Sequence, residues 1–222
     1  MIITVGGVKG GAGKSTIATN LAIIASQDPK KEVLLIDADD QESSYNFTAL
    51  RNELLPEKGA GYSVAKLTGL NVRNEVLNLK KKFNTIIIDT GGRDTSSQRA
   101  AITVSDILLV PYVPKTFDVW TVDDVDKILN EMLPSNPTLR CCAFLNRADT
   151  KGQDNEAAIA AIKNSPHLLL LDSIVIHRKA FGNAVAQGKS VIELRPKDRK
   201  AISEIKELYT EVFENILIGE EA

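Results

Sequence analysis

The sequence has few cysteines and no long apolar run, and each shortage excludes a class of protein. Its 222 residues include two cysteines, the neighbours Cys141 and Cys142. Neighbouring residues of a strand point to opposite faces, so a disulfide between these two is not expected. They match no zinc or iron–sulfur spacing. No apolar run approaches the roughly 18 residues of a membrane span. A disulfide scaffold, a metal–thiolate protein and a membrane-spanning protein are therefore not expected.

Signals for export and for a second domain are also missing. The first five residues, Met-Ile-Ile-Thr-Val, have no basic start and no small-residue cleavage site, so they predict a first strand and a cytoplasmic protein. The apolar fraction of 43% and the charged fraction of 25% are typical of a globular chain. We expect a single domain over residues 1–222, with no room before Ile2 for a helix-turn-helix domain.

Short apolar runs alternate with helix-like stretches along the chain. Several runs are continuously apolar, which is typical of strands that are covered on both faces. The alternation predicts an α/β fold with a mostly parallel twisted sheet and helices on both faces. The expected strands are Ile2–Val5, Val33–Asp37, Thr85–Asp89, Ile107–Val113, Cys141–Asn146 and Leu168–Ile176, and the expected helices are Ser15–Ser26, Glu42–Leu54, Val72–Lys82, Ser96–Ser105, Phe117–Met132, Asn155–Lys163 and Asp198–Leu217.

A glycine-rich loop follows the first expected strand and opens the first helix. Glycines allow the tight turn that aims backbone N–H groups at an anion, and the helix adds its positive N-terminal end. Lys14 would contact the β- and γ-phosphates of a nucleotide, and the Ser15 hydroxyl would ligate Mg²⁺. The strict phosphate-loop pattern is not met, because Val8 stands where its first glycine belongs. The expected nucleotide-binding residues of the loop are Gly10, Gly11, Ala12, Gly13, Lys14, Ser15 and Thr16.

Residues 9–16 read K-G-G-A-G-K-S-T and resemble the deviant Walker A motif of the ParA/MinD superfamily of ATPases. The resemblance implies a P-loop NTPase that hydrolyses ATP and that dimerises around it. Lys9 matches the family's signature lysine, which reaches the phosphates held by the partner subunit. Residues 105–111 and 117–120 resemble the family's small plasmid-type partition ATPases.

Carboxylates follow two expected strands, where a parallel sheet places its ligands. Residues 37–41, D-A-D-D-Q, resemble the family's D-x-D-P-Q segment, with Asp40 in the place of proline. By position, Asp39 matches the residue that orients the hydrolytic water and Asp37 a second-shell Mg²⁺ residue. An acidic surface turn is the alternative. Asp89 ends an Ile-Ile-Ile strand that resembles Walker B, which suits a hydrated Mg²⁺. The Gly91-Gly92 pair after it predicts a mobile switch segment.

Two further groups of residues are interpreted through the resemblance. Asn146 matches a residue that reads the adenine ring in related ATPases, and a turn-starting asparagine is the alternative. Between residues 178 and 200 there are seven basic and two acidic residues, whereas the whole chain has a net charge of −2. This segment predicts nonspecific contacts to DNA phosphates, with a solvated basic face as the alternative. The candidate DNA-binding residues are Arg178, Lys179, Arg195, Lys197, Arg199 and Lys200.

The favoured function is a DNA-partition ATPase, nucleoid-associated in the cytoplasm. It would bind Mg²⁺ and ATP, dimerise, coat DNA and be stimulated by a ParB-like or adaptor protein. A positioning ATPase for a protein cargo and a nucleotide-dependent metabolic enzyme are the alternatives. A membrane-cycling division-site regulator is disfavoured, because residues 201–217 are rich in glutamate and the tail, Ile-Gly-Glu-Glu-Ala, has no basic residue. We expect no membrane partner.

Overall fold

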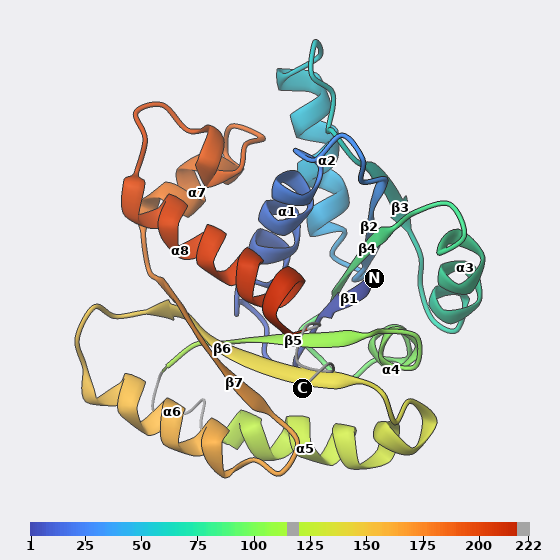
Figure 1. Ribbon diagram of the computed structural model, residues 1–222, viewed down its shortest axis with the longest axis vertical. Coiled ribbons are helices and arrows are strands. Elements are labelled where there is room, and N and C mark those ends of the chain that lie inside the picture. The colour runs from blue at the N-terminus through green and yellow to red at the C-terminus, as the bar shows by residue number, and fades with distance from the viewer. Residues whose placement is uncertain (115–119, 217–222) are drawn as a thin grey trace.

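The computed structural model describes residues 1–114 and 120–216, and it is built around one seven-stranded sheet (Figure 1). The strand order is β3-β2-β4-β1-β5-β6-β7, and every neighbouring pair is parallel. The strands are β1 (Ile2–Val5), β2 (Val33–Ala38), β3 (Ser63–Lys66), β4 (Thr85–Thr90), β5 (Ile107–Tyr112), β6 (Arg140–Ala148) and β7 (Leu169–Ile176). The predicted P-loop NTPase fold is confirmed.

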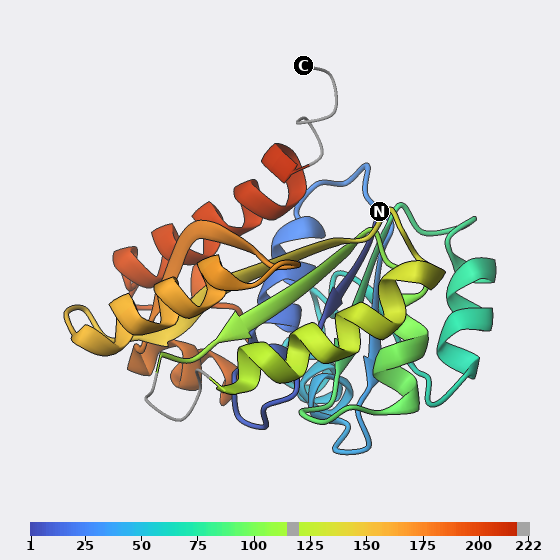
Figure 2. The same ribbon diagram turned by 90° about the horizontal axis from the view of Figure 1, so that it is seen from below.

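Helices cover both faces of the sheet (Figures 1 and 2). The α-helices are α1 (Lys14–Ala25), α2 (Ser43–Leu54), α3 (Asn71–Leu79), α4 (Ser96–Ile102), α5 (Trp120–Met132), α6 (Gln153–Asn164), α7 (Lys179–Val185) and α8 (Arg199–Thr210). Helices α1, α7 and α8 share one apolar core with one face of the sheet, while α3, α4, α5 and α6 bury the other. Short turns η2 (Leu133–Ser135) and η3 (Val191–Glu193) and a π-turn, η4 (Glu211–Asn215), complete the described elements.

The six expected strands and seven expected helices are present, with bounds shifted by a few residues. Two elements were not predicted. Strand β3 is a four-residue edge strand without a fully buried side chain. Its sequence, Ser-Val-Ala-Lys, contains no continuous apolar run that would have predicted it. Helix α7 has seven residues and contains Gly182, which lowers helix propensity. The expected start of the fifth helix at Phe117, the F-D-V motif there, and the acidic tail lie outside the described residues.

The central strands are buried on both faces, as their apolar runs predicted. Ile86, Ile87 and Ile88 of β4 have no exposed surface, and Cys141 and Cys142 of β6 are buried as free thiols. Strand β1 lies between β4 and β5; the crossover that leaves β1 leads to β2 on one side of it, whereas the crossover that leaves β5 leads to β6 on the other side. Ligands bind at such a switch point, beyond the carboxyl ends of the strands. The loop after β1 lies there.

Candidate nucleotide-binding site

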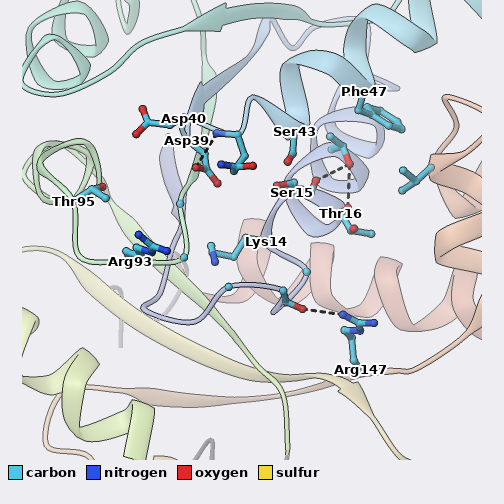
Figure 3. Close-up of a pocket in the computed structure, with 18 residues that line it drawn as sticks. Lys14, Ser15, Thr16, Asp39, Asp40, Ser43, Phe47, Arg93, Thr95 and Arg147 are labelled. Atoms are coloured by element: carbon cyan, nitrogen blue, oxygen red, sulfur yellow. Dashed lines mark hydrogen bonds between the residues drawn. The ribbon is translucent and has the colours of Figure 1, made fainter.

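The phosphate loop, residues 6–13, runs from the end of β1 to the start of α1. Gly11 and Gly13 have φ angles of 74° and 87°, a region that favours glycine. Gly13 is also the N-cap of α1, and no side chain caps that helix end, so its first N–H groups remain available to an anion. The loop borders a hollow of about 650 Å³, the loop hollow, which residues 39–41, 43, 91–93 and 95 also line (Figure 3).

Lys14 lines the loop hollow and contacts the backbone of the phosphate loop. Its side chain is buried, and Nζ donates a hydrogen bond to the carbonyl oxygen of Lys9 at 2.8 Å. Burial lowers the pKa of Lys14, and the charges of Asp89 and Asp39 act against that shift. A triphosphate in the hollow would supply oxygens to which this ammonium group could turn. The position fits the phosphate-binding role expected from the sequence.

Asp89 is a buried carboxylate at the end of β4 and a candidate ligand for a divalent cation. It is completely buried, and neither carboxylate oxygen has a hydrogen-bond partner among the described residues. Burial raises its pKa to about 7, the charge of Asp37 adds to the rise, and Lys14 and the nearby hydroxyls of Ser15 and Ser44 partly offset it. An unpartnered buried carboxylate is costly, and a hydrated Mg²⁺ is an oxygen-seeking ion that would satisfy it. The residues present therefore fit the metal.

Asp37 is paired with Asp89 in the register of β2 and β4, yet its carboxylate is already occupied. Oδ2 accepts hydrogen bonds from the Ser44 hydroxyl at 2.9 Å and from the Tyr45 N–H at 2.8 Å, and Oδ1 accepts one from the Asp39 N–H. Asp37 thus holds the start of α2 and the turn that carries Asp39. Its predicted place near Mg²⁺ stays a prediction.

Asp39 reaches the rim of the loop hollow, beside the switch segment. A Cβ on Gly91 would lie 3.1 Å from Asp39 Oδ1, and a Cβ on Gly92 would lie 2.5 Å from both the N and the Cα of Gly10. We expected the Gly-Gly pair to provide mobility. That stays a prediction, and the structure adds a second role, because the switch backbone approaches the phosphate loop so closely that a side chain at position 92 would collide with it.

Gln98 of α4 is a site residue that the sequence did not indicate. It is buried, and Oε1 accepts hydrogen bonds from the Gly7 N–H and from the Thr90 hydroxyl, each at 3.1 Å. One side chain thus joins the phosphate loop to the end of the Walker B strand. A glutamine three residues after a Thr95 N-cap resembles ordinary helix capping, so no motif pointed to it.

A second hollow of about 270 Å³, the side hollow, lies on the other side of Gly13 and Thr16. The end of β6 and residues 175–182 complete its walls. Asn146 lines it, is buried, and donates from Nδ2 to the carbonyl oxygen of Ala12 at 2.6 Å. The hollow is of a size to hold a nucleobase, and the adenine-reading role of Asn146 stays a prediction.

Five of the six candidate DNA-binding residues gather around a third hollow of about 510 Å³, the basic hollow. It lies between α7 and the start of α8, and it is lined by the exposed side chains of Lys179, Arg195, Lys197, Arg199 and Lys200. The sixth, Arg178, is set apart. Its Nε donates to Glu204 of α8 at 3.0 Å, and both side chains are mostly buried. Arg178, the N-cap residue of α7, therefore joins the start of α7 to α8.

No helix among residues 1–114 and 120–216 is long and apolar enough to cross a membrane.

A family model described as the CobQ/CobB/MinD/ParA nucleotide binding domain matches residues 3–192. The chain is 27% identical over 215 residues to the maintenance of carboxysome distribution protein A of Halothiobacillus neapolitanus, and the match covers 95% of both chains.

Solved structures show the same fold. An ATP complex of an McdA variant from Cyanothece has a TM-score of 0.75 at 18% identity, covering 95% of both chains. A plasmid partition protein from Borrelia burgdorferi bound to AMPPNP has a TM-score of 0.72 at 21% identity, covering 98% of both. At such identities the likeness concerns the fold alone. The match to residues 3–192 adds what the fold cannot: the chain belongs to the CobQ/CobB/MinD/ParA nucleotide-binding domain family and is an ATPase.

Proposed function

We propose that this ATPase positions a protein cargo by cycling on DNA. The observation that carries the proposal is the match over 95% of both chains to a protein named for carboxysome distribution. A second such protein, from Gloeobacter kilaueensis, is 25% identical over 193 residues. Both relatives are named for carboxysome distribution, which supports a protein assembly as the class of cargo for this chain. The partner is an adaptor protein on the cargo.

The nucleotide cycle is assigned to the loop hollow. Lys14 and the loop N–H groups bind the phosphates of ATP, and Lys9 reaches the triphosphate held by a second copy, so that ATP joins two subunits. Ser15 and Asp89, with Asp37 behind them, would hold Mg²⁺, which neutralises phosphate charge when bound. Asp39 orients the attacking water. Hydrolysis and release of the products then allow the two subunits to separate.

DNA is the surface on which the dimer is held, and the basic hollow is the contact. Its cations belong to the start of α7, to the N-terminus of α8 and to the segment before α8, and the hollow is open to solvent. Contacts of this kind bind phosphates without reading sequence. The localisation that follows is the nucleoid.

The ATP-dependent part of the proposal is tested with Asp39→Ala. This variant is expected to bind ATP, to dimerise, and to remain on plasmid DNA without hydrolysis. Sedimentation with ADP and with ATP, each with and without DNA, measures the association. An Asp39→Ala protein that stays monomeric at saturating ATP would contradict the cycle.

The nature of the cargo needs a cellular test. A plasmid or chromosome region is the second candidate, favoured by the fold likeness to the Borrelia partition protein. Deleting the gene is expected to leave replicon inheritance unchanged while protein assemblies cluster or are lost from daughter cells. Microscopy of the assemblies and a plasmid-retention assay measure the two outcomes. Replicon loss with normally spaced assemblies would transfer the proposal to the second candidate.

A further inference from the structure

The end of β6 contains an irregularity directly beside the phosphate loop. In the pairing with β7, Asn146 is opposite Val175 and Ala148 is opposite Ile176, so Arg147 is an extra residue between them. Its φ angle is 54°, one of two positive values among the described non-glycine residues. A β-bulge of this kind changes where a side chain points, and bulges are frequent next to active sites.

The bulge changes what two consecutive residues can reach. On a regular strand, neighbouring side chains point to opposite faces. Here Asn146 Nδ2 donates to the Ala12 carbonyl at 2.6 Å, and Arg147 Nη1 donates to the Gly11 carbonyl at 2.8 Å. Two neighbouring side chains thus hold two neighbouring carbonyls of one loop, and Figure 3 shows the arginine contact. The left-handed conformation of Arg147 makes this arrangement possible.

The backbone conformation of Arg147 is unfavourable for any residue with a Cβ, and no buried packing of its own side chain accounts for it. The side chain is exposed, and besides the bond to Gly11 it makes a weak one from Nε to His177 Nδ1 at 3.5 Å. Strained conformations persist where the surrounding structure holds them, and they concentrate at functional sites.

Arg147 also occupies a particular place between the hollows. It lines both the loop hollow and the side hollow, together with Gly13 and Thr16. A nucleotide with its phosphates in the first and its base in the second has to pass this point. The phosphate nearest the ribose would lie there, and a guanidinium group suits a phosphate oxygen.

We propose that Arg147 is a nucleotide-positioning residue that acts within its own subunit. With Asn146 it fixes the phosphate loop through the carbonyls of Gly11 and Ala12, and its charge lies beside the phosphate nearest the ribose. The inference deepens the nucleotide site of this ATPase and needs neither DNA nor cargo. Positioning predicts an effect on ADP and ATP alike, because both carry that phosphate.

Three substitutions of Arg147 test the inference. Arg147→Gln is expected to weaken ADP binding about ten-fold, and Arg147→Lys to recover part of the affinity, since lysine keeps the charge without the fork. Arg147→Gly removes the Cβ from the left-handed position. It should therefore keep or raise the thermal midpoint of the nucleotide-free protein while losing as much ADP affinity as Arg147→Gln. Lys151→Gln, which changes an exposed cation in the connection that follows β6, is the control.

The measurement is the Kd of a fluorescent ADP analogue, at protein concentrations where the chain is monomeric, beside the melting curve of the free protein. Unchanged ADP affinity in Arg147→Gln would overturn the inference. Loss of ATP hydrolysis alone, with ADP affinity intact, would also overturn it, because the arginine would then act on a second copy. A failed DNA or cargo experiment would leave these values untouched, so the two proposals fail separately.

Discussion

At the scale of single residues, the site depends on how closely its backbone segments approach each other. Gly92 shows this most clearly, since a Cβ there would meet Gly10 backbone atoms at 2.5 Å. Two backbones cannot yield as a flexible side chain would. The sequence placed a Gly-Gly pair after Walker B but could not show that the second glycine is required by a neighbour about 80 residues earlier in the chain.

Gly92→Ala is expected to separate the switch segment from the phosphate loop. The predicted result is a loss of ATP turnover and nucleotide affinity, with a destabilisation of about 1–3 kcal/mol from the forced backbone shift. Steady-state phosphate release and urea unfolding measure the two effects. Gly152→Ala is the matched control, because nothing lies within 4 Å of the added carbon there. Normal turnover in Gly92→Ala would show that the contact is not needed.

Asp89 and Asp37 face each other in the register but differ in their partners, which gives a paired prediction. Asp89→Asn removes an unpartnered buried charge, so the nucleotide-free protein at pH 8 is expected to melt about 5 °C higher. Asp37→Asn removes the acceptor of three hydrogen bonds and is expected to cost about 1–3 kcal/mol. Both are expected to lower Mg²⁺-dependent hydrolysis. Equal melting shifts for the two variants would contradict the distinction between them.

At the scale of elements, a buried ion pair joins α2 to η3. Arg51 donates to both carboxylate oxygens of Glu193, at 2.7 and 2.9 Å, and to the carbonyls of Ala60 and Gly188. Ser190, at the start of η3, bonds through its hydroxyl to Asn20 of α1. The segment that leads to the basic hollow is therefore fixed to the helices that follow the phosphate loop and Asp39.

The pair predicts a sensitivity to acid. Burial acts to raise the pKa of Glu193, but hydrogen bonds from Arg51 and the Ser190 N–H and the charge of Arg51 outweigh it, so the pKa is lowered. A carboxyl group with a lowered pKa stabilises the fold above its ordinary value of 4.5 and loses that contribution as the pH falls through the lowered value.

Glu193→Gln is therefore expected to destabilise the protein by about 2–4 kcal/mol at pH 7, since it leaves Arg51 buried without its counter-charge. The difference from wild type should shrink below pH 4.5, where the wild-type group becomes protonated. Urea unfolding at several pH values measures how the free energy of unfolding of the wild type and of the variant changes with pH. Glu75→Gln, on the exposed face of α3, is the control. A difference that stays constant from pH 7 to pH 3.5 would contradict the assignment.

The sequence predicted those elements whose residues carry a local signal. Continuous apolar runs predicted the central strands, and the glycine-rich loop indicated Lys14 and Ser15 as candidate nucleotide-binding residues. Strand β3 and helix α7 were missed because tertiary contacts, rather than an apolar run or strong propensity, hold them. The contacts of Gln98 and the bulge at Arg147 depend on which segments become neighbours in the fold. No pattern within a single segment encodes that.

At the scale of the whole molecule, the charge is unevenly distributed. The chain has a net charge of −2, whereas residues 178–200 contain seven basic and two acidic residues. Five of those cations line the basic hollow, whereas Arg178 lies apart from them and pairs with Glu204. An acidic molecule with one concentrated basic surface orients itself toward a polyanion and repels it elsewhere.

Lys197→Ala combined with Lys200→Ala tests whether that surface binds DNA. Each lost phosphate contact is expected to reduce the slope of log affinity against log salt by about 1, so the double variant should lose about 2 from the slope and bind all sequences more weakly. Fluorescence anisotropy with random-sequence duplexes from 50 to 200 mM salt, in ATP, measures this. Lys80→Ala with Lys81→Ala, on the opposite side of the sheet, changes the net charge equally. If both double variants shifted the slope alike, the effect would belong to net charge, and the basic hollow would lose its role as the DNA contact.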